Sequence, residues 1–155
     1  MMLGRLGSKQ VLYGNTGETF SLFGKENLER YKLMEKKTKG QVEAQISEAM
    51  IKFEKEYMGR GPIETKTYIL KDMIVVRLKG VFTPAEEQLA KTHEGAGLIK
   101  KLRTQLLETA KEALEKMIAS ITDARVISLH TDISTRRGER IIIFVLNQDL
   151  EMRFD

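Results

Sequence analysis

The sequence contains no cysteine. A chain without cysteine can form no disulfide, no thiolate metal site and no thiol nucleophile, so these three kinds of site are excluded. The same absence is typical of proteins from reducing compartments. We therefore expect a cytoplasmic protein, in which any membrane role would be peripheral.

Long apolar runs are also missing. The longest, Ile141–Leu146, has six residues, whereas a membrane-spanning helix needs about 20. Residues 1–10 lack the apolar stretch of about seven or more residues that a secretory signal requires. We expect neither a transmembrane segment nor a signal peptide.

Positive charge exceeds negative charge by four over the whole chain, but the excess lies near its start. Residues 1–40 contain eight basic and four acidic side chains, which leaves 18 of each sign for residues 41–155. Nucleic-acid-binding domains usually cluster Lys and Arg on the face that meets phosphates. A nucleic-acid partner is therefore not expected for the neutral remainder of the chain.

The length of 155 residues, with 41% apolar and 31% charged residues, is typical of one globular domain. We divide the chain into a Gly-rich basic leader (1–36), an α+β domain (37–150) and a C-terminal tail (151–155). Gly14-Asn15-Thr16-Gly17 favours a tight turn, so the leader is either a flexible arm or a hairpin that docks on the domain or on a second protomer.

The first half of the domain predicts one helix and one hairpin. Thr38 and Gln41 fit a capping box, and apolar residues then recur at intervals of three and four as far as Tyr57, the stripe of an amphipathic helix. The run 59–62, Gly-Arg-Gly-Pro, ends it. Two strand patterns follow, Ile63–Leu70 and Met73–Lys79.

The second half repeats this order. Thr83-Pro84-Ala85-Glu86 predicts a helix start with a capping box. Gly95 and Gly97 are expected to interrupt or bend that helix before it continues to Ile121. Strand patterns at 125–134 and 140–147 form a second hairpin. The resulting fold class is α+β: a four-stranded, mainly antiparallel sheet with helices packed on one face, built as a duplicated α-β-β arrangement.

The strand that contains Ile141–Leu146 is apolar on both of its faces. The helices can cover only one face of the sheet, so the other face needs a cover as well. A second copy of the chain is the simplest one, and we expect a homodimer.

Polar side chains offer few candidates for chemistry. His130 and Asp132 share one face of a strand and could hold a metal or orient a proton, but a metal site needs three or four ligands and His93 has no companion at ligand spacing. A polar sheet face, with His130 hydrogen-bonded to Asp132, is favoured over a metal site. No metal or other cofactor is expected.

Arginines near turns could contact an anion such as phosphate or an acidic headgroup. Arg136, Arg137 and Arg140 lie around the second hairpin turn, and Arg60 lies at a helix end. A solvated hairpin tip and ordinary helix capping explain the same residues and are favoured.

The remaining motifs favour structure over catalysis. Glu54 and Glu56, like Glu86 and Glu87, are placed on predicted helix surfaces, where they support capping and solubility. Residues 95–97 lack the Lys and Ser/Thr of a phosphate loop, and no Ser, His and acid occur in a recognisable nucleophile motif. We expect no enzyme activity.

Three segments resemble the MpsC family of small bacterial proteins, some of which are called YbcI-like. The first consists of residues 40–43 together with residues 59–62, the second of residues 75–86 and the third of residues 130–135. The resemblance as a whole covers about residues 37–150. It implies association with a sodium-translocating, membrane-potential-generating system linked to bicarbonate or sodium transport, in which other subunits do the membrane work. Arg77 joins the candidates because it matches a recurring family position, whereas Gly97 departs from the family pattern.

The expected function is that of a soluble, non-enzymatic accessory protein that docks on a membrane transport subunit. The candidate contact residues are Arg60, Arg77, His130, Asp132, Arg136, Arg137 and Arg140. The alternative is a ligand- or nucleic-acid-binding regulatory protein in which the basic leader meets phosphates.

Overall fold

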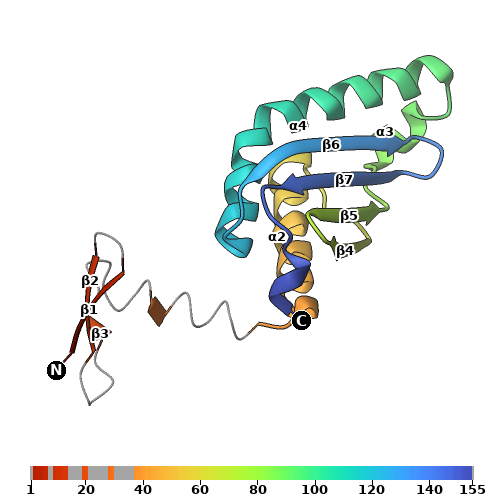
Figure 1. Ribbon diagram of the computed structural model, residues 1–155. Helices are drawn as coiled ribbons and strands as arrows, with labels where there is room; N and C mark the ends of the chain where they lie inside the picture. The colour runs from red at the N-terminus through yellow and green to blue at the C-terminus, as the bar shows by residue number, and fades with distance from the viewer. Residues whose placement is uncertain (1, 7–8, 14–18, 21–27, 30–36, 155) are drawn as a thin grey trace. The chain divides into compact units, whose positions relative to one another are not determined.

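The computed structural model describes residues 2–6, 9–13, 19–20, 28–29 and 37–154 (Figure 1). Contacts divide the chain into two units, Met1–Lys37 and Thr38–Asp155. In the first unit, strands β1 (Met2–Leu6), β2 (Lys9–Tyr13) and β3 (Thr19–Phe20) pair antiparallel in that order. The turn that the sequence predicts at residues 14–17 lies outside the described residues.

The second unit begins with helix α2 (Lys39–Met58). The predicted capping box is present: the Thr38 hydroxyl accepts from the Gln41 N–H at 3.2 Å, and the Gln41 side chain accepts from the Thr38 N–H at 2.9 Å. The helix ends at Gly59, whose φ of 82° is the left-handed conformation that glycine adopts without penalty.

Two hairpins form one sheet. Strands β4 (Glu64–Leu70) and β5 (Met73–Lys79) make the first hairpin, and β6 (Val126–Ser134) and β7 (Glu139–Leu146) make the second. All neighbours are antiparallel, in the order β4-β5-β7-β6. The two hairpins therefore meet along β5 and β7, and β4 and β6 are the edge strands.

The second helical segment is broken, but not where the sequence predicts. Helix α3 (Pro84–Leu89) begins with the expected Thr83 and Glu86 capping box. Helix α4 (His93–Thr122) then starts anew, with Thr92 accepting from the Gly95 N–H at 3.0 Å. The prediction that Gly95 and Gly97 interrupt the helix is wrong, because α4 runs through both glycines and the break lies before them.

Helices α2 and α4 lie on the same side of the sheet (Figure 1). The hydrophobic core fills the space between these helices and the inward face of the sheet. Its fully buried side chains include Ile46, Met50, Ile69, Ile74, Val76, Leu78, Ile99, Leu107, Leu114, Ile118, Ile142 and Phe144. The predicted α+β fold is confirmed, and the element order gives the duplicated α-β-β arrangement.

Acidic side chains occupy the outer edge of β4 and the turn that follows it. The backbone N–H of Ile69 donates to Glu43 of α2 at 2.9 Å, and that of Lys71 donates to Glu151 at 3.0 Å. Glu151 opens the short 3-10 helix η1 (Glu151–Phe154). The C-terminal segment is thus attached to the sheet, and Phe154 packs against the core.

Among the residues that the structure describes, no helix combines the length and the hydrophobicity needed to cross a bilayer.

Candidate functional site

Four charged side chains meet inside the second unit, each from a different element. They are Glu54 of α2, Glu86 of α3, Arg103 of α4 and Arg140 of β7. Glu54 is 0% exposed, Arg103 2% and Arg140 1%. The sequence prediction that Glu54 lies on a helix surface is therefore wrong. We call these four residues the buried charge cluster.

Arg103 is the centre of the buried charge cluster. Its Nε and Nη2 donate to the two carboxylate oxygens of Glu86 at 2.6 and 2.9 Å, the bidentate geometry that suits a guanidinium. Nη2 also donates to the Val81 carbonyl at 2.8 Å, and Nη1 lies 3.5 Å from Glu54. The guanidinium carbon is 5.5 Å from the centroid of the Phe82 ring. These contacts hold α3 and the preceding loop against α4.

Arg140 joins the sheet to the same cluster. Its Nη1 lies 3.5 Å from the second carboxylate oxygen of Glu54, and Nη2 donates to the Arg103 carbonyl at 2.8 Å. Its Nε is buried without a hydrogen-bond partner. Arg140 is therefore inside the protein and is not part of the hairpin tip on which the sequence places it beside Arg136 and Arg137.

The charges of the cluster balance, because two guanidinium groups face two carboxylates. Burial raises the pKa of Glu54, and the opposing effects of Arg140 and Arg103 do not fully offset it. Burial likewise lowers the pKa of Arg140, against the attraction of Glu54. Burial also tends to raise the pKa of Glu86, but the hydrogen bonds and the charge of Arg103 outweigh this effect, so that the pKa of Glu86 is lowered. Such an arrangement fixes the relative positions of four elements.

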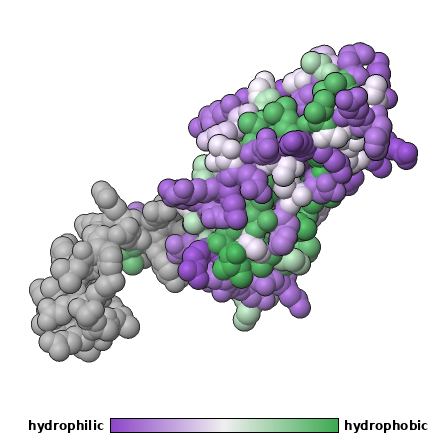
Figure 2. All heavy atoms as spheres, turned by 90° about the horizontal axis from the view of Figure 1, so that it is seen from above, coloured by the Kyte–Doolittle hydropathy of each residue, from purple (hydrophilic) through white to green (hydrophobic). Residues whose placement is uncertain are grey.

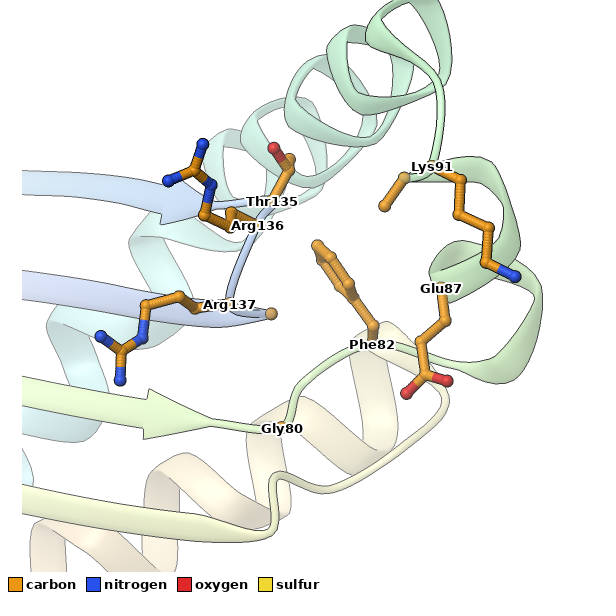
Figure 3. A pocket seen from close by; sticks show the side chains of 9 residues that line it. Gly80, Phe82, Glu87, Lys91, Thr135, Arg136 and Arg137 are labelled. Carbon is orange, nitrogen blue, oxygen red and sulfur yellow. The ribbon is translucent and has the colours of Figure 1, made fainter.

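A hollow of about 370 Å³ lies beside the tip of the second hairpin (Figure 3). The residues that line it are Gly80, Phe82, Glu87, Ala90, Lys91, Thr135, Arg136, Arg137 and Gly138. Figure 3 shows the Phe82 side chain in the middle of this group, whereas the guanidinium groups of Arg136 and Arg137 extend away from it along the sheet. The hollow is thus bounded by backbone and side-chain stems, and its cationic groups face solvent.

The other predicted contact residues are spread over separate places. Arg60 donates to the Phe82 carbonyl at 2.8 Å, which ties the end of α2 to the loop before α3. Arg77 forms an ion pair with Glu139, which also lies 3.7 Å from Arg137. Of these candidates, only Arg136 and Arg137 line the hollow.

His130 and Asp132 do not contact each other as the sequence predicts. The His130 ring lies 3.2 Å from the Ser128 hydroxyl, and Asp132 lies 3.4 Å from Lys100 of α4. A hydrogen bond from the Ile133 backbone, together with Lys100, holds the pKa of Asp132 below its usual value. Within the described part of the chain, no three His, Asp or Glu side chains gather as a metal site would require.

The outward face of the sheet, opposite to α2 and α4, is partly apolar. Register places Tyr68, Val75 and Ile143 in one row across β4, β5 and β7, and Leu70, Met73 and Val145 in the next. Tyr68 is 44% exposed, Leu70 47% and Met73 37%, and Ile141 beside them is 39% exposed. We call these seven residues the outward apolar block. A second exposed apolar pair, Leu98 and Leu102, lies on α4, and Figure 2, seen from above, shows hydrophobic surface among hydrophilic residues.

The fold thus defines a small α+β domain built from two α-β-β units. Its residues 38–148 match the family described as "Na+-translocating membrane potential-generating system (MpsC)". The chain belongs to the MpsC family, and the resemblance inferred from the sequence is confirmed.

Two proteins of Bacillus subtilis (strain 168) are similar to this chain. "Uncharacterized protein YbcI" is 46% identical over 120 residues, which cover 77% of this chain and 97% of that protein. "Uncharacterized protein YrhF" is 26% identical over 109 residues, which cover 69% and 88% respectively. No solved structure matches the chain.

Proposed function

We propose that this chain is a non-enzymatic accessory protein of a sodium-translocating, membrane-potential-generating system, and that it acts as a homodimer docked on a membrane-embedded subunit. The observation that carries the proposal is the family match over residues 38–148, whose description names such a system. The buried charge cluster supports a role in binding rather than in catalysis, because its buried charged side chains form ion pairs with one another.

The docking contact is the tip of the second hairpin. Arg136 and Arg137 are exposed there, and Lys91 lies on the other side of the hollow. The tip is held in place from behind, since the Val81 N–H donates to the Gly138 carbonyl at 3.0 Å. A cationic, well-supported tip fits an acidic loop of a partner, where guanidinium groups form charge-assisted hydrogen bonds with carboxylates.

The test is cross-linking in native membranes, with the chain tagged at its own locus and the captured subunits identified. Recovery of an ion-translocating membrane subunit is expected with the natural sequence and is expected to fall in the double variant Arg136→Glu/Arg137→Glu. The matched control, Lys111→Glu/Arg125→Glu, makes the same change in net charge at exposed positions elsewhere. The proposal fails if no such subunit is enriched, or if both double variants lose it equally.

A physiological readout accompanies the capture. In vesicles from cells that lack the chain, the sodium-dependent membrane potential is expected to be smaller than in vesicles from the parent cells. Supplying the natural sequence restores it, and the Arg136→Glu/Arg137→Glu variant does not. A potential that is unchanged by loss of the chain contradicts the proposal.

A further inference from the structure

We infer that the outward face of the sheet is the surface through which two copies of this chain pair, which extends the dimer proposed above. The surface contains the outward apolar block and, next to it, a group of charged side chains. The two parts together specify both the occupant and its orientation.

The outward apolar block lies on neighbouring strands and is continuous. Its members come from β4, β5 and β7, which are joined in register, so adjacent side chains are about 5 Å apart across the strands. An antiparallel sheet that has one face in water normally alternates apolar inward and polar outward residues. At Val75, Ile143 and Val145 this sheet instead carries apolar residues outward, and such a patch marks an interaction surface.

Charged residues fill the rest of the outward face, towards the end where the second hairpin turns. One register row contains the charged residues Glu64, Lys79 and Glu139, and the next contains the charged residues Lys66, Arg77 and Asp132, with Ile141 of the outward apolar block between Arg77 and Asp132. Three of these six side chains are acidic and three are basic, so this part of the face is neutral. A face with no excess charge does not repel its own copy, whereas a partner selected by opposite charge would call for an excess.

The distribution of these charges is suited to a two-fold axis. Basic residues Lys66, Arg77 and Lys79 lie on β4 and β5, together with the acidic Glu64, and acidic residues Glu139 and Asp132 lie on β7 and β6. Consider an axis that runs parallel to the strands, midway between β5 and β7, in the plane between two facing sheets. It places each β5 over β7 of the second copy, and each β4 over β6.

This axis matches opposite charges or apolar side chains at several positions, although it also sets Arg77 over Ile141 of the second copy and Tyr68 over its His130. Lys79 then faces Glu139 of the second copy, and Lys66 faces its Asp132, while Val75 faces its Ile143. An axis perpendicular to the strands would instead set the charged rows on the apolar block. Facing sheets pack about 10 Å apart with their strands rotated by about 30°, so the match is closest for the central pair, Val75 with Ile143.

The first experiment measures the oligomeric state of the purified full chain by sedimentation velocity, with no membrane present. The natural chain is expected to be a dimer, and Val75→Glu/Ile143→Glu a monomer. The control Leu102→Glu alters an exposed apolar residue of α4 and is expected to remain dimeric. Circular dichroism and the unfolding midpoint establish that each variant is folded. A monomeric natural chain overturns the inference.

The second experiment exchanges the charges of Lys66 and Asp132. These residues lie on opposite edge strands, three strand spacings or roughly 14 Å apart, so within one chain they cannot pair. Lys66→Asp and Asp132→Lys are each expected to raise the dimer dissociation constant about tenfold, because like charges then face each other twice. The double variant is expected to restore it.

Mixing the two single variants gives the sharpest result. In a mixed dimer both contacts again join opposite charges, so the mixture is expected to form heterodimers in preference to either homodimer. If these charge exchanges leave the dimer dissociation constants unchanged, the proposed orientation is wrong. Because no membrane partner takes part, failure here leaves the docking of the hairpin tip untouched, and loss of membrane capture leaves the dimer untouched.

Discussion

Gly95 lies so close to Leu89 that a Cβ on residue 95 would be 1.9 Å from the Leu89 carbonyl oxygen. The end of α3 therefore packs directly on the first turn of α4, and residue 95 must be glycine for it to do so. Gly97, two residues further along the same helix, has nothing within 4 Å of the corresponding position. The two glycines of this turn differ in role although they look alike in sequence.

A pair of alanine variants tests this difference. Gly95→Ala is expected to destabilise the domain by several kcal/mol, because the backbone of α3 must move. Gly97→Ala is expected to stabilise it by up to about 1 kcal/mol, since alanine is the better helix former. Urea unfolding of each variant measures both effects, and equal changes in the two variants would contradict the packing described.

Removal of Arg140 is expected to cost about 3 kcal/mol, because Glu54 would lose one of its two buried cationic partners. The variant Arg140→Met keeps much of the side-chain volume, and the loss is measured as the free energy of unfolding at neutral pH. The double variant Arg140→Met/Glu54→Gln also removes the charge of the carboxylate that has lost this partner, and it is expected to be more stable than the single variant. A double variant that is less stable than the single one would show that Glu54 needs no cation.

The same variant predicts a pH dependence. The pKa of Glu54 is already raised by burial above its ordinary value of 4.5, and loss of Arg140 raises it further. A carboxyl group with a raised pKa in the folded state contributes stability at low pH and loses it as pH rises through that pKa. The difference in unfolding free energy between the natural chain and Arg140→Met is therefore expected to become smaller as pH falls from neutral towards 4.5. Unfolding curves at successive pH values follow this trend.

Glu86 predicts the opposite trend. Its pKa is lowered below 4.5 because Arg103 outweighs the effect of burial, so its charge contributes stability above 4.5 that is lost as pH falls through the lowered pKa. Glu86→Gln keeps a side chain that can complete the capping box but removes the charge. The difference in unfolding free energy between Glu86→Gln and the natural chain is expected to be largest near neutral pH and to diminish in acid. A difference that is constant with pH would contradict the ion pair.

Arg103→Lys is expected to destabilise the domain by about 2 to 3 kcal/mol, because an ammonium group cannot reproduce the bidentate contact with Glu86 while also reaching the Val81 carbonyl. The control Lys101→Arg, at an exposed position of the same helix, is expected to be neutral within about 0.5 kcal/mol. Thermal unfolding compares the two. Equal stability of both variants would mean that the fork geometry is unimportant.

Local patterns were sufficient to predict most of the fold. The capping boxes at Thr38 and Thr83 require residues only three positions apart, and both are present. The strand patterns gave both hairpins to within a residue or so of the observed ends. The sequence predicts the break in the second helical segment at the wrong place. The low helix propensity of glycine suggests a break at Gly95, but Gly95 is needed for the close contact with Leu89. That contact joins two elements, so a local pattern does not reveal it.

The buried charge cluster was missed for a similar reason. Glu54 follows Met50 by four residues, and Arg103 follows Ile99 by four, so each lies on the buried stripe of its own helix. That spacing is a usable signal for Glu54, although its charge favours a place on the helix surface. Glu54 and Arg103 are 49 residues apart in sequence, and their ion pair depends on how α2 packs against α4. The apolar pattern of a single helix contains no information about that packing.

The carboxylates of Glu43 and Glu151 have a consequence for how copies of this chain can associate. By accepting from the N–H of Ile69 on β4 and from the N–H of Lys71 in the turn that follows, they occupy hydrogen-bonding positions at this end of the edge strand. Extension of the sheet through this border is thereby blocked, so the dimer proposed above, which pairs sheet faces, would not grow along β4 into a filament.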